Sequence, residues 1–273
     1  MYLEFLGLRE KPFSITTDPS FLYLSKRHRE ALSHMVYGVQ ERKGFIEITG
    51  EVGTGKTTLC KTLLRQLDPK TKTALILHSN LSELQLLHTI VEDFGLDPMR
   101  TSRPNLFNQL NRFLLDQANL GNNLVLIVDE AQNLSLRLLE QIRMLSNLET
   151  DKDKLIQIIL VGQPQLRDKL NLPSMRQIQQ RIAVRYHILP LDLDEVRTYI
   201  EHRLRVAGSD GSLAWSEDAI EEVFQCSQGI PRLINLISDR ALLACYVFRV
   251  KSVDRGIVRR SHQELMGQVL PSS

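Results

Sequence analysis

The nine residues from Gly50 to Thr58 have the composition and spacing of a phosphate-binding loop, and they lie between an expected strand and an expected helix. Glycine lets the backbone turn its N–H groups toward phosphate oxygens, and the start of a helix adds partial positive charge. We expect Lys56 to reach the β- and γ-phosphates of a nucleotide and the Thr57 hydroxyl to bind Mg²⁺. The alternative is an ordinary glycine-rich turn. The candidate nucleotide-binding residues here are Gly50, Glu51, Val52, Gly53, Thr54, Gly55, Lys56, Thr57 and Thr58.

Two adjacent carboxylates, Asp129 and Glu130, follow the apolar run 124–128. Ligands of an open α/β sheet bind at the carboxyl ends of its strands, so this pair is expected to face the phosphate loop. Asp129 would hold Mg²⁺, and Glu130 would orient the attacking water. A solvated turn or a helix N-cap is the alternative. A residue that manages water favours hydrolysis of ATP over transfer to a small-molecule acceptor, which requires that water be excluded.

Hydrophobic periodicity predicts the elements that must position these residues. Short apolar runs indicate strands over residues 45–49, 73–78, 124–128, 156–161 and 184–189, and most of these runs are continuous enough for strands buried on both faces. Helical spacing lies between them, over residues 57–67, 84–94, 106–120 and 136–148. This alternation predicts an α/β fold with a parallel sheet flanked by helices. After Pro190 the pattern changes to three helices without a strand between them, over 192–206, 216–226 and 231–248. We therefore expect an N-terminal segment (1–44), an α/β domain (45–190) and a small helical domain (191–273).

Composition bounds the class of protein. The chain has 273 residues, 42% of them hydrophobic, and 34 basic against 32 acidic side chains, a net charge of +2. These values are typical of a globular protein and exclude a disordered or fibrous one; they neither require nor exclude nucleic acid. The longest apolar run, 241–248, is too short to span a membrane, and the N-terminus lacks a secretory signal. We expect a cytoplasmic protein. Its three cysteines, an odd number without metal-ligand spacing, are expected to be reduced thiols of the core: Cys60, Cys226 and Cys245.

Together these motifs resemble the AAA+ ATPases, and among them the ExeA/GspA/MshM-like group associated with type II secretion and pilus biogenesis. The resemblance covers nearly the whole chain and is carried by residues 2–13, 18–23, 28–32, 50–58, 128–134, 160–164 and 229–232. It implies a P-loop NTPase (AAA+) fold with a small C-terminal helical lid domain. Some members continue into a membrane anchor and a peptidoglycan-binding domain, so the resemblance implies either a short, MshM-like member or a truncated chain.

The resemblance also implies roles for residues outside the two motifs. Gln163 lies where the family places a polar sensor of the γ-phosphate, with a turn residue before Pro164 as the alternative. Arg232 resembles the arginine through which the lid contacts the nucleotide, and a surface arginine is the alternative. Arg181 resembles the finger that completes a neighbouring subunit's site, and Arg185 competes for this role; either could be a surface ion pair instead.

The N-terminal segment of the family folds over the adenine, which implies contacts from Phe21, Tyr23 and His28; plain packing is the alternative. The implied function is an ATPase whose ATP and Mg²⁺ bind at a subunit interface of a homo-oligomer, ring or filament. It would drive or time assembly of a secretion or pilus apparatus, with an inner-membrane protein as partner and a place peripheral to the inner membrane. The competing hypotheses are a DNA-associated ATPase regulator, for which basic clusters exist at 26–29, 203–205 and 255–260, and a silent nucleotide-binding scaffold.

Overall fold

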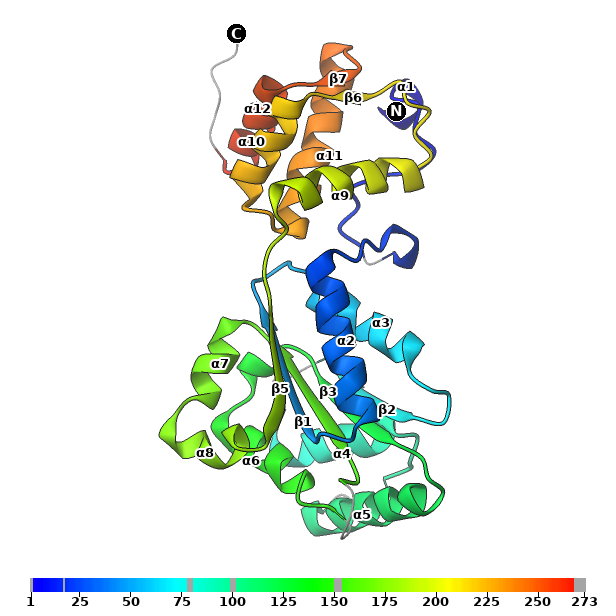
Figure 1. Ribbon diagram of the computed structural model, residues 1–273, viewed down its shortest axis with the longest axis vertical. Helices are drawn as coiled ribbons and strands as arrows, with labels where there is room; N and C mark the ends of the chain where they lie inside the picture. The colour runs from blue at the N-terminus through cyan, green and yellow to red at the C-terminus, as the bar shows by residue number, and fades with distance from the viewer. Residues whose placement is uncertain (1, 17, 78–80, 99–101, 150–153, 268–273) are drawn as a thin grey trace. The chain divides into compact units, whose positions relative to one another are not determined.

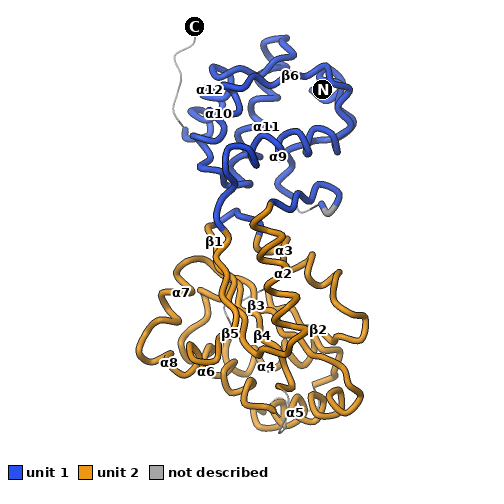
Figure 2. The backbone as a smooth tube through the Cα atoms, in the orientation of Figure 1, with its two compact units in different colours: residues 1–25, 52–55, 189–273 blue, residues 26–51, 56–188 orange. Residues whose placement is uncertain are grey.

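The computed structural model describes residues 2–267 except 17, 78–80, 99–101 and 150–153 (Figure 1). Contacts within the chain divide it into two compact units (Figure 2). Unit 1 comprises residues 1–25, 52–55 and 189–273, and unit 2 comprises residues 26–51 and 56–188. The domain boundaries expected from the sequence, after residues 44 and 190, stay predictions.

Unit 2 is built on a five-stranded parallel sheet whose strand order is β2-β3-β4-β1-β5. The expected strands are confirmed with small shifts, as β1 (Phe45–Gly50), β2 (Lys72–Ile76), β3 (Leu124–Val128), β4 (Gln157–Gly162) and β5 (Ile182–Ile188). Every residue of β1, β3 and β4 is buried, as expected for central strands covered on both faces. In β5, an outer strand of the sheet, only Val184 and Ile188 are buried. The last residue of the expected second strand, His78, lies outside the described residues.

The helices of unit 2 cover this sheet. The four expected ones are α3 (Lys56–Gln66), α4 (Glu83–Asp93), α5 (Arg103–Asn119) and α6 (Leu136–Leu145). Sequence reasoning missed α2 (Lys26–Gln40), α7 (Pro164–Leu170) and α8 (Arg176–Gln179). α2 packs on β5 and β1, and its buried residues recur at three- and four-residue spacing from His28 to Val39. This spacing could have predicted α2. The four basic or His residues in its first turn, however, interact unfavourably with the helix dipole.

Unit 1 contains the three expected C-terminal helices, α9 (Leu193–Val206), α10 (Glu217–Ser227) and α11 (Pro231–Phe248), together with α12 (Arg255–Leu265), which was not predicted. The expectation that no strand separates these helices is wrong, because β6 (Ala214–Trp215) pairs in parallel with β7 (Ser252–Val253). Strands of two residues are too short to show a period in sequence. Ser216 caps α10 by accepting from the Ala219 N–H, as is usual for serine at an N-cap.

The N-terminal residues are part of unit 1. They form α1 (Tyr2–Phe5) and a short 3-10 turn, η1 (Pro19–Phe21), and they bury Leu6 and Phe13 in one apolar cluster with α9 to α12. The Arg9 N–H donates to the Ala207 carbonyl at 2.9 Å. The buried guanidinium of Arg203 donates to the carbonyls of Pro12 and Ser14. Apolar burial and hydrogen bonds therefore join this segment to α9.

The three cysteines are free, with Cys60 and Cys245 buried and Cys226 half-buried. Among the described residues, each helix is too short or too polar to cross a lipid bilayer. The same residues contain no cluster of three His, Cys, Asp or Glu side chains that could hold a metal ion.

Candidate functional site

The loop after β1 gets its shape from two interior glycines. Gly53 and Gly55 have φ values of 84° and 92°, a region that side-chain-bearing residues rarely adopt. The loop returns directly into α3, which begins at Lys56. The expected strand–loop–helix arrangement is therefore present, and the loop leads into the first turn of α3, whose N–H groups have no acceptor within the helix.

Lys56 folds back over the loop. Only 5% of the residue is exposed, and its Nζ donates to the carbonyls of Gly50 and Glu51, both at 2.9 Å. Burial lowers the pKa of this ammonium, and the carboxylates of Glu130, Asp129 and Glu51 oppose that shift. A buried cation with carboxylates nearby and neutral oxygens as its direct partners can exchange those oxygens for anionic ones.

Thr57 and Asp129 meet across the sheet edge. The Thr57 hydroxyl donates to Asp129 Oδ2 at 2.5 Å, and only 2% of Asp129 is exposed. The other oxygen, Asp129 Oδ1, accepts from the Glu130 N–H at 2.9 Å. A buried carboxylate and a hydroxyl side by side offer the hard oxygen ligands that Mg²⁺ prefers, so these residues fit the expected ion.

Glu130 lies in a strained turn and has two amide partners. Its φ of 51° is in the left-handed region, which costs a residue with a side chain about 1 kcal/mol. Its Oε2 accepts from Gln132 Nε2 at 2.5 Å and from Gln163 Nε2 at 3.3 Å. The predicted γ-phosphate sensor therefore contacts the predicted catalytic carboxylate.

Unit 2 thus brings five predicted residues to one edge of its sheet: Lys56, Thr57, Asp129, Glu130 and Gln163. The loop follows β1, the acidic pair follows β3, and Gln163 follows β4, which lies between those two strands. Parallel strands place their carboxyl ends at the same edge, which is the ligand-binding edge of open α/β sheets. This topology brings Lys56 and Thr57 of the first motif to the same sheet edge as the acidic pair.

Arg232 lies in unit 1, in the first turn of α11, next to the loop residues of that unit. Its backbone N–H donates to the Gly53 carbonyl at 3.3 Å, and a Cβ at Gly53 would lie 2.7 Å from the Cβ of Arg232. Glycine is therefore required at position 53 for packing as well as for its φ.

The two candidate finger residues have different partners. Arg181 donates from Nη1 to the carbonyl of Ser146 at 3.2 Å and to its hydroxyl at 2.9 Å. Arg185 forms an ion pair with the buried carboxylate of Glu47 at 3.2 Å and donates to the Gln179 carbonyl. The partners described for these two arginines are therefore not among the five residues that meet at the sheet edge.

The residues expected to cover adenine are divided between the units. Phe21 and Tyr23 lie in unit 1, where Phe21 stacks under the Arg203 guanidinium and Tyr23 contacts the edge of Tyr199. His28 is buried in α2 of unit 2. Adenine contact by these three stays a prediction.

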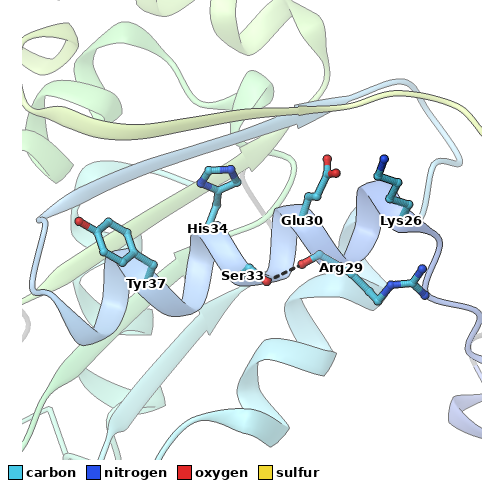
Figure 3. Close-up of a pocket in the computed structure, with 6 residues that line it drawn as sticks. All are labelled: Lys26, Arg29, Glu30, Ser33, His34 and Tyr37. Atoms are coloured by element: carbon cyan, nitrogen blue, oxygen red, sulfur yellow. Dashed lines mark hydrogen bonds between the residues drawn. The ribbon is translucent and has the colours of Figure 1, made fainter.

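A pocket of about 560 Å³ along the exposed side of α2 contains none of the predicted catalytic or phosphate-loop residues (Figure 3). In Figure 3, Glu30 and His34 project to the same side of this helix. His34 contacts the ring of Tyr186 in β5, whose hydroxyl donates to Glu30 at 2.8 Å. These contacts attach α2 to the edge strand.

Sequence reasoning missed Gln132, which contacts both Glu130 and the backbone of Gln163, and Lys169, which donates to the carbonyls of Gln132 and Leu134. Gln132 lies within residues 128–134, two positions after Glu130, so its place in the sequence could have indicated a contact with the acidic pair. Lys169 gave no signal, because it comes close only through the packing of α7 on the turn after β3.

Comparisons with known proteins give the relatives of this chain in sequence and in fold. A model of the AAA domain family matches residues 39–170. General secretion pathway protein A of Aeromonas hydrophila is 44% identical over 98% of this chain, which spans about half (49%) of that relative. Among solved structures, an Aeropyrum pernix ORC2 protein gives a TM-score of 0.66 at 19% identity, covering 93% of this chain and 71% of that one. The structure of Drosophila ORC bound to DNA gives a TM-score of 0.71 at 18% identity, covering 97% of this chain and 66% of that one. At such identities these structures show the fold alone.

Proposed function

Because this chain belongs to the AAA+ ATPases of the ExeA/GspA-like group, a class of ATP hydrolases, we propose that it binds Mg·ATP in the loop 50–58 and hydrolyses it with Glu130. The observation that carries this proposal is the meeting of Thr57 with Asp129, with Lys56 and Glu130 alongside at one sheet edge. A glycine loop, a buried ammonium and a paired carboxylate together suit a triphosphate with its cation.

Each residue has a distinct task in the proposed reaction. The loop N–H groups and Lys56 bind the phosphates, and Lys56 exchanges its loop carbonyls for phosphate oxygens. Thr57 and Asp129 would hold Mg²⁺, which when bound neutralises charge developing on the phosphoryl oxygens. The Glu130 carboxylate orients the attacking water and accepts its proton. Gln163 contacts that carboxylate and is proposed to sense the γ-phosphate from the N-terminus of α7.

We further propose that Arg232 responds to nucleotide through the loop, a role supported by its backbone contact with Gly53. For the finger supplied to a neighbouring subunit we favour Arg181 over Arg185. Arg185 is already paired with a carboxylate, whereas the described partners of Arg181 are a neutral carbonyl and hydroxyl. A guanidinium is charged in either case, but one that is paired with a carboxylate must give up that partner before it can bind a phosphoryl group.

The biological role proposed here follows the relative. A homo-oligomer of this ATPase would drive or time assembly of a secretion or pilus apparatus, at the inner membrane and with a membrane protein as partner. The DNA-associated alternative gains no support from the clusters at 255–260 and 203–205. Arg255, Arg259 and Arg260 pair with the glutamates of α10 and α12, and Arg203 is buried.

Substitution Glu130→Gln tests the proposed reaction. Because the amide cannot accept the proton of water, we expect ATP turnover to fall by about 10²- to 10⁴-fold while ATP affinity persists, so that ATP is trapped. Turnover is measured by phosphate release and affinity by calorimetry. The matched control is Glu140→Gln, a half-exposed carboxylate on α6 paired with Arg143, which should leave both values unchanged. Unchanged turnover in Glu130→Gln, or no binding of ATP by the wild type, would overturn the proposal.

A further inference from the structure

Gln132 uses both ends of its side-chain amide at the site. Its Nε2 donates to Glu130 Oε2 at 2.5 Å, and its Oε1 accepts from the backbone N–H of Gln163 at 3.0 Å. Gln163 is the N-cap residue of α7 and directly follows β4. One amide therefore connects the carboxylate after β3 to the backbone after the neighbouring strand.

The surroundings hold this amide in place. A Cβ at Gly162 would lie 2.7 Å from Gln132 Oε1, so a residue without a side chain makes room for the Gln132 carbonyl oxygen. The Gln132 main chain is fixed by Lys169, whose Nζ donates to the carbonyls of Gln132 and Leu134 at 2.5 and 2.7 Å. Contacts of the Gln132 main chain and contacts of its side chain thus both fix the position of the amide.

The amide is one of two side-chain donors that approach a single oxygen of Glu130. Gln132 is the nearer, at 2.5 Å, and Gln163 Nε2 lies at 3.3 Å from the same Oε2. A hydrogen bond from a fixed donor to a carboxylate selects one side-chain rotation among several otherwise allowed ones. A carboxylate that must accept a proton from water needs its free oxygen aimed at that water.

We propose that Gln132 is a positioning residue: it holds Glu130 through Oε2, so that the second carboxylate oxygen faces the attacking water. This inference rests on the proposed role of Glu130. In this proposal Gln132 acts only through that carboxylate and has no direct role toward the nucleotide or the water.

The test compares Gln132→Met, which keeps the length of the side chain but not its amide, with the wild type. We expect kcat to fall by about 10- to 100-fold, the loss expected for one hydrogen bond to a charged group, while the ATP dissociation constant and the melting temperature stay within about twofold and two degrees. Gln132→Glu should fall further, because it places a second negative charge beside Glu130. The control Gln141→Met removes an amide that donates to the Glu83 carbonyl on α4, and should leave kcat unchanged.

A double-mutant cycle separates positioning from a structural role. In the Glu130→Gln background, Gln132→Met should have no further effect on the residual rate, because the group it positions has lost its function. A structural role would lower both rates and nucleotide affinity alike, and would overturn the inference, as would an unchanged kcat in Gln132→Met alone. If Glu130→Gln itself retains turnover, the proposed function fails and not merely this inference.

Discussion

Arg181 and Arg185, four positions apart in the sequence, differ in the groups that their guanidinium charges contact. Arg185 lies opposite Glu47 in the β1–β5 pairing and forms an ion pair with its buried carboxylate. Removing Arg185 would leave that carboxylate buried without its cation, which is destabilising. Arg181 donates to the neutral carbonyl and hydroxyl of Ser146, so breaking these hydrogen bonds leaves no unpaired charge behind. We therefore propose Arg181 as the finger and Arg185 as a cation that stabilises the fold.

A mixing experiment tests this division. Arg181→Ala should assemble with ATP but hydrolyse it about 10³-fold more slowly, because the neighbouring site loses the charge that stabilises its transition state. Glu130→Gln should also be inactive. Mixed in equal amounts, the two variants should recover turnover, since a site in an Arg181→Ala subunit can receive Arg181 from a Glu130→Gln neighbour. Phosphate release as a function of mixing ratio measures this. A mixture as inactive as its parts would place Arg181 outside any shared site.

At the scale of elements, β1 carries an acidic residue inside a fully buried strand. Glu47 is 3% exposed, and burial raises the pKa of its carboxyl group, an effect that Arg185 and Arg167 oppose only in part. The protonated form of Glu47 is thus favoured more by the folded than by the unfolded chain. Its contribution to stability is present below the ordinary pKa of glutamate and is lost as the pH rises through the raised value.

Replacement of Glu47 by Gln therefore has an expected dependence on pH. The amide stays neutral, so the free energy of unfolding at pH 7 to 8 should be equal to or greater than that of the wild type, and the difference should shrink toward pH 4. Arg185, about half exposed, can be hydrated once its partner is gone. Denaturant unfolding across this pH range measures the effect, with Glu41→Gln on the surface of the same unit as control. Lower stability of Glu47→Gln at pH 7.5 would mean that the ion pair outweighs the cost of burial.

The elements of unit 2 show what sequence can predict. Strands such as 124–128 are continuous apolar runs, and parallel topology then brings the residues that follow them together, so the phosphate loop and acidic pair could be placed in one site. Contacts such as Gln132 to Gln163 could not be predicted, because they depend on side-chain rotations after packing. In unit 1, β6 and β7 were not predicted because strands of two residues show no period. α12 was not predicted because its three buried or half-buried apolar residues, Ile257, Val258 and Leu265, are spread among basic and polar ones.

At the scale of the whole chain, the first 25 residues are separated from the C-terminal helices by a complete α/β unit in sequence, yet belong to the same compact unit. They contribute Leu6, Leu8, Phe13 and Phe21 to its apolar cluster, and the carbonyls of Pro12 and Ser14 to the buried Arg203. The helical unit is thus completed by both ends of the chain. Its stability should depend on residues distant in sequence from its helices.

Deletion of residues 2–25 tests this dependence. The deletion exposes apolar surface of α9 and α11 and leaves the Arg203 guanidinium without its carbonyl acceptors, so unit 1 should lose about 3 kcal/mol or more of unfolding free energy. The sheet of unit 2 keeps all its own strands and helices and should be little affected. Hydrogen exchange distinguishes the two, since amides of α9 to α11 should lose protection while those of β1, β3 and β4 keep theirs. Equal loss in both units would show that they unfold as one, and unchanged protection in α9 would show that the N-terminal residues contribute little to it.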